Sequence, residues 1–343
     1  MTQPLTAVVD GPKTPDMVEF SAHQQRGVEE LERLRLRAPC RVANASRNAG
    51  AELGRRRRWG SARDSLWDFV GASIEDGTRV AIVGAGNGDD LPLRRIARRA
   101  GAVTLIDLDP RAAQGARRRL GRAERAKVDV IGHDVTEGAA DAIVLAALGG
   151  EEVDPVPATV GGPAPIASAD AQRSASAAAD LPHLAAEPDG EGRPLPGAPY
   201  DLVIGDLFYS QLLYPALVDL GVDPDRSAET LVRHAPGLTR AVVARLHASA
   251  PLVVHIHDPI AWWDGHEQPV ALGEILASAA GEGTDAALDL VARGVGPHES
   301  DPRAALADLD LTPTATALWR WPFAPGVDYL ACATLARSAD RRA

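Results

Sequence analysis

Residues 79–109 read RVAIVGAGNGDDLPLRRIARRAGAVTLIDLD. An apolar run ends at three alternating glycines, which are Gly84, Gly86 and Gly88. A helical pattern and a second apolar run follow, and that run ends in Asp107. The pattern predicts a strand, a glycine turn, a helix and a second strand. The rest of the chain is interpreted as an extension of this unit.

The acidic residues of this stretch indicate what it binds. Glycines let the backbone turn sharply and let a ligand approach closely, and Asp107 can accept hydrogen bonds from a ribose diol. A nicotinamide dinucleotide would require a third glycine where this chain has Asp89. Asp89 and Asp90 also place negative charge where a pyrophosphate would sit. A cationic sulfonium nucleoside therefore fits the pattern better than a polyanion.

The glycine turn and the segment over 106–110 resemble the cofactor half of class I S-adenosylmethionine (SAM)-dependent methyltransferases. Many members carry an acid two places before the first glycine, where this chain has Ile82. The resemblance implies an α/β fold, with a seven-stranded, mostly parallel sheet, a terminal antiparallel hairpin and a helical N-terminal cap. It also implies SAM as cosubstrate or sole substrate. The implied cofactor-binding residues are Gly84, Gly86, Gly88, Asp107, Leu108, Asp134, Asp206 and Phe208.

Two of these residues keep an alternative interpretation. Asp134 follows a predicted third strand and matches the family acid that contacts adenine, but it could instead cap the helix expected over 137–148. Phe208 follows the fourth strand, which ends in Asp206. Its ring could cover the sulfonium by a cation–π contact, as could that of Tyr209, or it could belong to the core.

The expected catalytic residues are Asp206, Tyr209 and His257. Asp206 could hold an amine, and His257 could act as a general base. His255 and His257 share one face of the predicted fifth strand. A metal site with Asp258 or His266 is the weaker alternative because further ligands are missing, so no metal is expected.

The chain is expected to contain a flexible N-terminus, a helical cap, a SAM-binding domain and a low-complexity insertion or lid. Their bounds are 1–15, 16–74, 75–337 and 149–198, the last lying within the third. Helices are predicted over 41–59, 62–69 and 238–248, and a helix is the one regular element compatible with 167–186. Strands over 314–321 and 328–336 should form the terminal hairpin.

The composition limits the classes of partner. The net charge is −11, which argues against general affinity for nucleic acid or anionic membranes. The four arginines over 55–58 are therefore interpreted as a solvated helix face with one or two ion pairs. Cys40 and Cys332 provide no disulfide framework, and no run is long enough for a signal or membrane segment. We expect a cytoplasmic protein with a small-molecule substrate, and its oligomeric state, including a homodimer, stays open.

The resemblance implies a SAM-dependent transferase, most simply a methyltransferase that acts on a small molecule in bacterial specialised metabolism. A second reading rests on residues 89–93 and 106–110, which also resemble nicotianamine synthases. Those enzymes transfer the 3-amino-3-carboxypropyl arm of SAM. Related chemistry closes the arm to azetidine-2-carboxylate and releases 5′-methylthioadenosine. A non-catalytic SAM-binding or partner protein is the third alternative.

Overall fold

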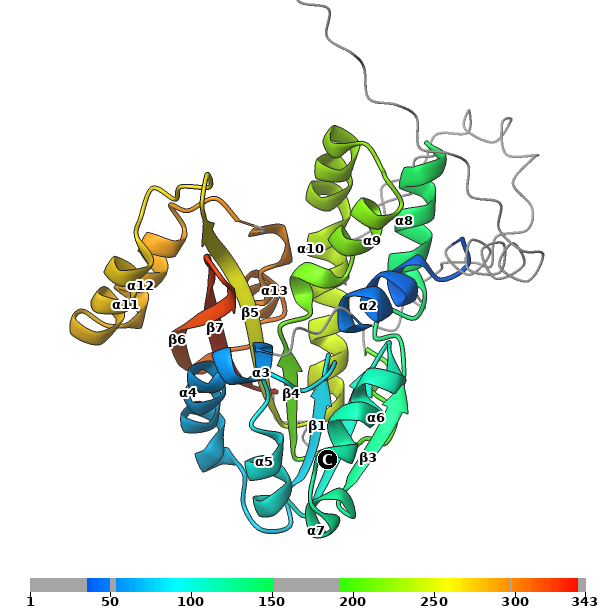
Figure 1. The fold of residues 1–343 in the computed structure, drawn as a ribbon, viewed down its shortest axis with the longest axis vertical. Coiled ribbons are helices and arrows are strands. Elements are labelled where there is room, and N and C mark those ends of the chain that lie inside the picture. Colours follow the sequence, from blue (N-terminus) through cyan, green and yellow to red (C-terminus); the bar gives the residue numbers. More distant parts are fainter. Residues whose placement is uncertain (1–35, 50–53, 151–191, 297, 339–343) are drawn as a thin grey trace, which may run out of the picture.

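The computed structural model describes residues 36–49, 54–150, 192–296 and 298–338. Their strands form one seven-stranded sheet in the order β3-β2-β1-β4-β5-β7-β6 (Figure 1). The strands are β1 (Arg79–Val83), β2 (Ala102–Asp107), β3 (Val128–Gly132), β4 (Leu202–Asp206), β5 (Leu252–Trp263), β6 (Pro313–Ala324) and β7 (Val327–Arg337). The chain thus has the seven-stranded class I methyltransferase fold that its sequence predicts.

Strands β1 to β5 run parallel, whereas β7 is antiparallel to both β5 and β6. The expected terminal hairpin is confirmed, but its strands are longer than predicted. Ala324 pairs with Val327, so residues 322–324 belong to β6 and the turn is Pro325-Gly326. Pro322 did not end the strand because β6 lies at the edge of the sheet, where a missing N–H is tolerated.

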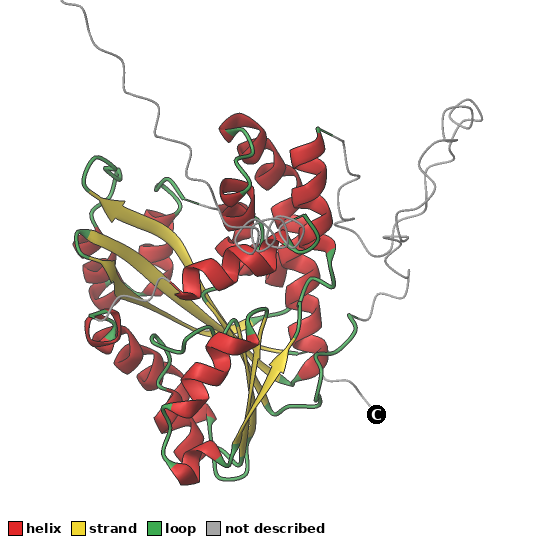
Figure 2. Cartoon of the chain, turned by 45° about the vertical axis from the view of Figure 1, so that its right-hand side comes forward, coloured by secondary structure: helices red, strands yellow, loops and turns green. Residues whose placement is uncertain are grey.

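Helices cover both faces of the sheet (Figure 2). The longer helices are α2 (Pro39–Ala49), α4 (Gly60–Val70), α6 (Pro110–Arg118), α8 (Ala139–Gly149), α10 (Pro224–Ser249), α11 (Leu272–Gly281) and α12 (Thr284–Val291). The shorter ones are α3 (Arg55–Arg58), α5 (Leu93–Arg99), α7 (Arg122–Arg125), α9 (Tyr214–Asp219) and α13 (Pro302–Asp308). Single 3₁₀ turns are η1 (Gly71–Ser73), η2 (Tyr209–Gln211) and η3 (His298–Ser300).

Side chains alternate between the two faces of each buried strand, and they form one hydrophobic core on each side of the sheet. In β1, Val80 and Ile82 pack against α4, α5 and α6, whereas Ala81 and Val83 pack against α10 and α13. Ile82 is fully buried, and burial of such a side chain contributes about 1.5–3 kcal/mol. Both faces of the central strands are apolar, which is the pattern of a parallel sheet that helices enclose.

The helical cap departs from the expected pattern. The single helix predicted over 41–59 is wrong, because α2 ends at Ala49 and α3 starts only at Arg55. Pro39 is the first residue of α2. At this position a backbone N–H has no partner within the helix, so proline, which lacks the N–H, is well tolerated. The expected segments 1–15 and 16–35 lie outside the described residues, as does 151–191 with its expected helix over 167–186.

Two further differences concern the second half of the chain. The helix predicted over 238–248 is much longer, since α10 includes Pro236. Pro236 is exposed, so water can satisfy the carbonyl that lost its partner. Leu195, which the expected insertion contained, is buried and its N–H donates to Ser249 Oγ over 2.8 Å. No helix in the described part of the chain has the length and apolar character needed to cross a membrane.

Candidate functional site

The strand order reverses at β1, which lies between β2 and β4. In open α/β sheets, ligands bind beside the carboxyl ends of the strands at such a point. The glycine turn follows β1, Asp107 ends β2 and Asp206 ends β4. The parallel registers place these ends on one edge of the sheet. The sequence-predicted residues of this region therefore do come together.

The glycine turn is closely packed as well as sharply bent. Gly84, Gly86 and Gly88 all have positive φ, at 77°, 45° and 59°. A Cβ on Gly84 would lie 2.8 Å from the Asp206 carbonyl oxygen and 2.9 Å from Phe208 Cβ. Glycine at position 84 thus lets the end of β4 touch the turn that follows β1.

Asp107 organises the turn through its carboxylate. Its Oδ2 accepts the Gly86 N–H over 2.7 Å, and its Oδ1 accepts the Asp109 N–H over 2.7 Å. Oδ1 also accepts from Asn44 Nδ2 of α2 over 3.1 Å. A ribose diol at Asp107 would therefore either share this carboxylate with Asn44 or replace the asparagine.

Asp206 is the unusual group of this edge. Its side chain is 3% exposed, and neither carboxylate oxygen has a hydrogen-bond partner. Leu207 follows with φ of 51°, so the chain turns sharply right after the acid. Burial, then the charges of Asp90 and Asp107, raise the pKa of Asp206 well above its ordinary value. An unpaired buried carboxyl beside two other acids is an arrangement that a cation would stabilise.

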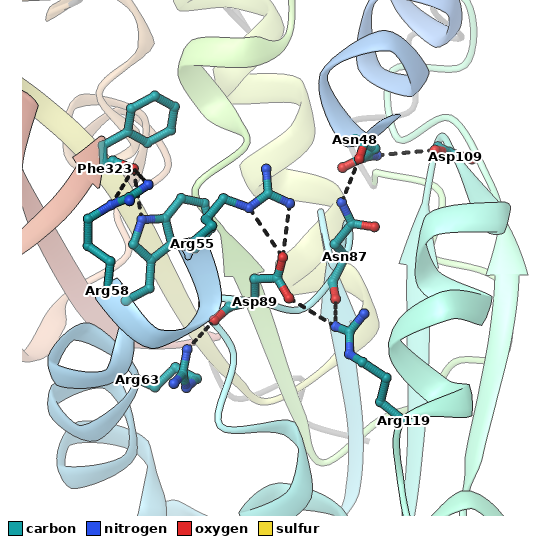
Figure 3. A network of polar contacts seen from close by, with 10 residues as sticks. Asn48, Arg55, Arg58, Arg63, Asn87, Asp89, Asp109, Arg119 and Phe323 are labelled. Atoms are coloured by element: carbon teal, nitrogen blue, oxygen red, sulfur yellow. Dashed lines mark hydrogen bonds and ion pairs between the residues drawn. The ribbon is translucent and has the colours of Figure 1, made fainter. Parts of the chain in front are cut away.

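The two acids after the glycine turn have different roles (Figure 3). Asp89 does not add free negative charge to the ligand side, because Arg55 Nη2 binds its Oδ2 at 2.9 Å and Arg119 Nη2 binds its Oδ1 at 3.1 Å. The expectation for Asp89 was therefore wrong. Burial and the Asp89 charge raise the pKa of Asp90 to about 6, and its place on the ligand side stays a prediction.

Phe208 and Tyr209 lie in the core. The Phe208 ring is 9% exposed, packs under Gly84 and stacks on Tyr209 at 4.3 Å between centroids. The Tyr209 hydroxyl lies 2.6 Å from His255 Nδ1, and His255 Nε2 lies 3.0 Å from His247 Nε2. These contacts orient both rings into the core below Gly205, so the direct contacts expected from them with the sulfonium or substrate are not supported. Sequence reasoning missed the histidine partners because they come from β5 and α10.

His257 is also placed away from the sheet edge. Its side chain is buried, and its Nε2 lies 3.3 Å from Oδ1 of Asp301, which caps α13. Burial is the main cause that lowers the pKa of His257 to about 4. His257 and His255 share the α10 side of the sheet, and a base role at the ligand is not supported for His257. Within the described residues, no group of three or more metal-ligating side chains comes together.

Asp134 acts as a loop cap in this structure. Its Oδ1 accepts from the N–H and the hydroxyl of Thr136, and its Oδ2 accepts from the Gly138 N–H over 2.7 Å. These contacts close the loop before α8 but do not cap the helix, whose N-cap is Gly138 without a side-chain hydrogen bond, so the helix-capping alternative is wrong. The adenine contact stays a prediction. Leu108 is half-buried and packs against the cluster that α2, α8 and α9 form.

Asp258 is the residue that sequence reasoning undervalued. β4 and β5 pair through Asp206 and Ile256, so Asp258 follows directly at the same sheet edge. It lies in the irregular pairing between His257 and Ile260 and accepts from Ser210 Oγ over 2.8 Å. Burial raises its pKa to about 7, although the Ser210 hydrogen bond opposes this. The residue was classed with a histidine motif, whereas the strand alternation and bulge separate it from His257.

Aromatic side chains of the hairpin lie near Asp258. Tyr329 of β7 pairs with Ala261, three residues after Asp258 on β5, and burial and then the charge of Asp258 raise the pKa of Tyr329. The rings of Trp321 and Tyr329 are 5.7 Å apart, and the Trp321 Nε1 is buried without a partner. The middle of β5 and the facing hairpin thus combine a titratable carboxyl, a half-buried tyrosine ring and a buried donor without a partner.

Comparisons with known proteins find weakly similar solved structures, among them SAM-dependent methyltransferases. No family model matches the chain, and no curated protein matches it by sequence. A SAM-dependent methyltransferase from Aquifex aeolicus is 12% identical, with 94% of this chain and 100% of that chain covered and a TM-score of 0.34. The magnesium protoporphyrin IX methyltransferase from Synechocystis, solved with bound SAH, is 13% identical, with 91% and 100% covered and a TM-score of 0.39. At such low values these neighbours assign no substrate or activity to this chain.

Proposed function

We propose that this protein is a SAM-dependent transferase that acts on a small molecule. The observation that carries the proposal is Asp206, a buried carboxyl without a partner beside the glycine turn. A ligand with a ribose diol and a positive charge satisfies both Asp107 and Asp206. SAM has a diol, a sulfonium and an ammonium group, so the residues fit it, whereas the acids disfavour a pyrophosphate.

The chain's residues would divide the work of binding. Asp107 would accept from the ribose, the turn around Gly86 would approach the nucleoside closely, and Asp206 with Asp90 would hold positive charge. Bound SAM supplies an electrophilic carbon next to sulfur. The protein would then contribute alignment of the second reactant, which is a large part of the catalysis of such transfers.

Asp258 would serve the second reactant. Its pKa of about 7 allows it to be ionised near neutral pH and to accept a proton from an attacking hydroxyl or amine. Ser210 fixes the carboxylate, and the rings of Trp321 and Tyr329 offer contact area for an apolar acceptor. Asp258 thereby replaces His257 as the proposed proton acceptor.

The nucleoside product tests the proposal. Purified protein with SAM alone, and then with pools of small-molecule acceptors, is analysed by mass spectrometry. S-adenosylhomocysteine would support methyl transfer. Formation of 5′-methylthioadenosine would instead support transfer or cyclisation of the aminocarboxypropyl arm. Calorimetric SAM binding without either product would favour a binding protein, and absence of SAM binding would overturn the proposal.

Replacing Asp206 with asparagine should separate binding from stability. We expect SAM affinity to fall by at least about tenfold, since a buried charge partner of the cation is lost. The melting temperature should rise at neutral pH. The raised pKa means that folded Asp206 holds its proton more tightly than unfolded Asp206, so the wild type loses stability as pH rises above about 4. The gain of the variant should therefore vanish at lower pH.

Asp129→Asn provides the matched control for Asp206→Asn. Asp129 is an exposed carboxylate on β3, and its replacement changes the net charge equally. Scanning calorimetry and SAM titration should show neither effect in this control. Unaltered SAM affinity in the Asp206→Asn protein would show that Asp206 does not face the ligand.

A further inference from the structure

The outer side of the glycine turn holds a second, chemically different feature. A surface cavity of about 320 Å³ lies between α3, α4, α5 and α6, and Gly88 and Leu91 form part of its wall. Six arginines line it, namely Arg56, Arg63, Arg94, Arg95, Arg98 and Arg119. Asp64 is the one acidic residue of the lining. This concentration of positive charge occurs in a chain whose net charge is −11.

Part of this charge is already neutralised. Arg95 pairs with Asp64 at 2.7 Å, and Arg94 and Arg98 share Glu124 at 3.5 and 2.9 Å. Asp89 serves both Arg119 and Arg55. The acids around the cavity are thus already engaged with arginines, and most of them are shared between two.

Among the arginines of the lining, Arg56 has no acidic partner among the residues that the structure describes, and its charge acts on Arg63 and Arg119. Arg56 is exposed and forms no ion pair or hydrogen bond within the described part of the chain. Burial and then the charge of Arg56 lower the pKa of Arg63, and the nearby Asp64, Asp89 and Asp90 offset this only in part. Burial and the charges of Arg56 and Arg55 lower the pKa of Arg119, and the charge of Asp89 offsets this only in part. The Arg56 guanidinium therefore repels those of Arg63 and Arg119.

We propose that this cavity binds the phosphate group of a small molecule. Guanidinium groups match phosphate oxygens in geometry and charge, and an anion between Arg56, Arg63 and Arg119 would relieve their repulsion. The size of the cavity suits a phosphate or a diphosphate with a small substituent. The acidic charge of the whole chain disfavours a long polyanion such as RNA. This site is separate from the proposed SAM site, whose ligand side is acidic.

Figure 3 shows how Asp89 holds two arginines of the cavity lining, Arg63 and Arg119. Arg63 and Arg119 reach Asp89 from α4 and α6, and Arg55 reaches it from α3. The Asp89 carboxylate thus holds Arg119 and Arg55, and its backbone carbonyl accepts from Arg63. Two arginines of the cavity lining, Arg63 and Arg119, are therefore fixed by the same residue.

Inorganic phosphate and pyrophosphate are the probes. Their affinity for the intact protein is measured by calorimetry, and the melting temperature is followed against sodium chloride at matched ionic strength. Arg56→Gln should weaken pyrophosphate binding by at least about fivefold, because a charged hydrogen-bond donor is lost. Arg57→Gln is the matched control, since Arg57 is an exposed neighbour on the same helix that does not line the cavity.

The possible outcomes distinguish a specific anion-binding site from a general effect of positive surface charge. Pyrophosphate stabilisation that Arg56→Gln weakens and Arg57→Gln retains supports the proposal. Equal losses in both variants, or no stabilisation beyond that of chloride, would overturn it. Tighter binding of a short single-stranded RNA than of pyrophosphate, with both arginines contributing, would overturn it in favour of a nucleic-acid surface. SAM titration of the same variants should be unchanged, so failure here leaves the proposed function intact.

Discussion

Replacing Asp258 with asparagine should lower turnover by about 10²–10⁴-fold, the usual contribution of a general base. The variant keeps the shape of the side chain but cannot take a proton. In the wild type, turnover should fall as the pH drops below about 7, because the pKa of Asp258 is about 7 and only the ionised form accepts the proton. The pH profile of kcat/KM should show this decrease below about pH 7, its acidic limb, in the wild type. The asparagine variant should lack this limb.

Ser210→Ala distinguishes a base from a structural residue. The Ser210 hydroxyl donates to Asp258 and holds the pKa of that carboxyl lower than burial alone would. Without this hydrogen bond the limb should move to higher pH and not disappear. Stability gives a second readout, since a raised pKa means that the wild type loses stability as pH rises through about 7, which Asp258→Asn should avoid. Persistence of the same limb in Asp258→Asn would assign the base to another group.

Replacing Asp107 with alanine should reduce SAM affinity by about 2–4 kcal/mol, or on the order of 30- to 1,000-fold, because charge-assisted hydrogen bonds to the diol are lost. The variant should also unfold more easily. The Gly86 and Asp109 N–H groups lose their acceptor, and each such orphaned group costs about 1–3 kcal/mol when buried. Calorimetric titration with SAM, below the unfolding temperature of the variant, measures the first effect.

Asn44→Ala is the control for Asp107→Ala. It removes the donor from α2 while the main-chain contacts of Asp107 remain. If the ribose replaces Asn44 at the carboxylate, SAM affinity in this variant stays equal or increases. A folded Asp107→Ala protein that binds SAM as tightly as the wild type would exclude Asp107 as the ribose acceptor.

Local sequence determined the fold and placed the glycine turn, Asp107 and Asp206 at the ends of strands. Apolar runs bounded by glycine and aspartate predicted β1, β2 and β4, because strands buried on both faces need continuous apolar residues. The terminal hairpin followed from two extended runs without a helix between them. These features depend on residues that are close in sequence, so their pattern is visible without the structure.

The lengths of helices and strands were less predictable where solvent exposure or a neighbouring segment determines where the element ends. Pro236 lies within α10 because its exposed position makes the lost hydrogen bond tolerable. The extension of β5 to Trp263 likewise depends on its pairing with β7. Propensity alone cannot report solvent exposure or neighbouring strands.

The candidate site residues also fall into two groups, those that the sequence predicts and those whose surroundings only the structure reveals. The sequence by itself placed Asp107 and Asp206 at the carboxyl ends of strands, since strand ends and their acids are local features. Only the tertiary structure decided that Asp206 lacks partners, that Asp89 is neutralised, and that Tyr209 faces His255. Partners in these contacts come from distant segments, and a charge's effect depends on its burial and neighbours. Charge at a site is therefore a property of the folded arrangement.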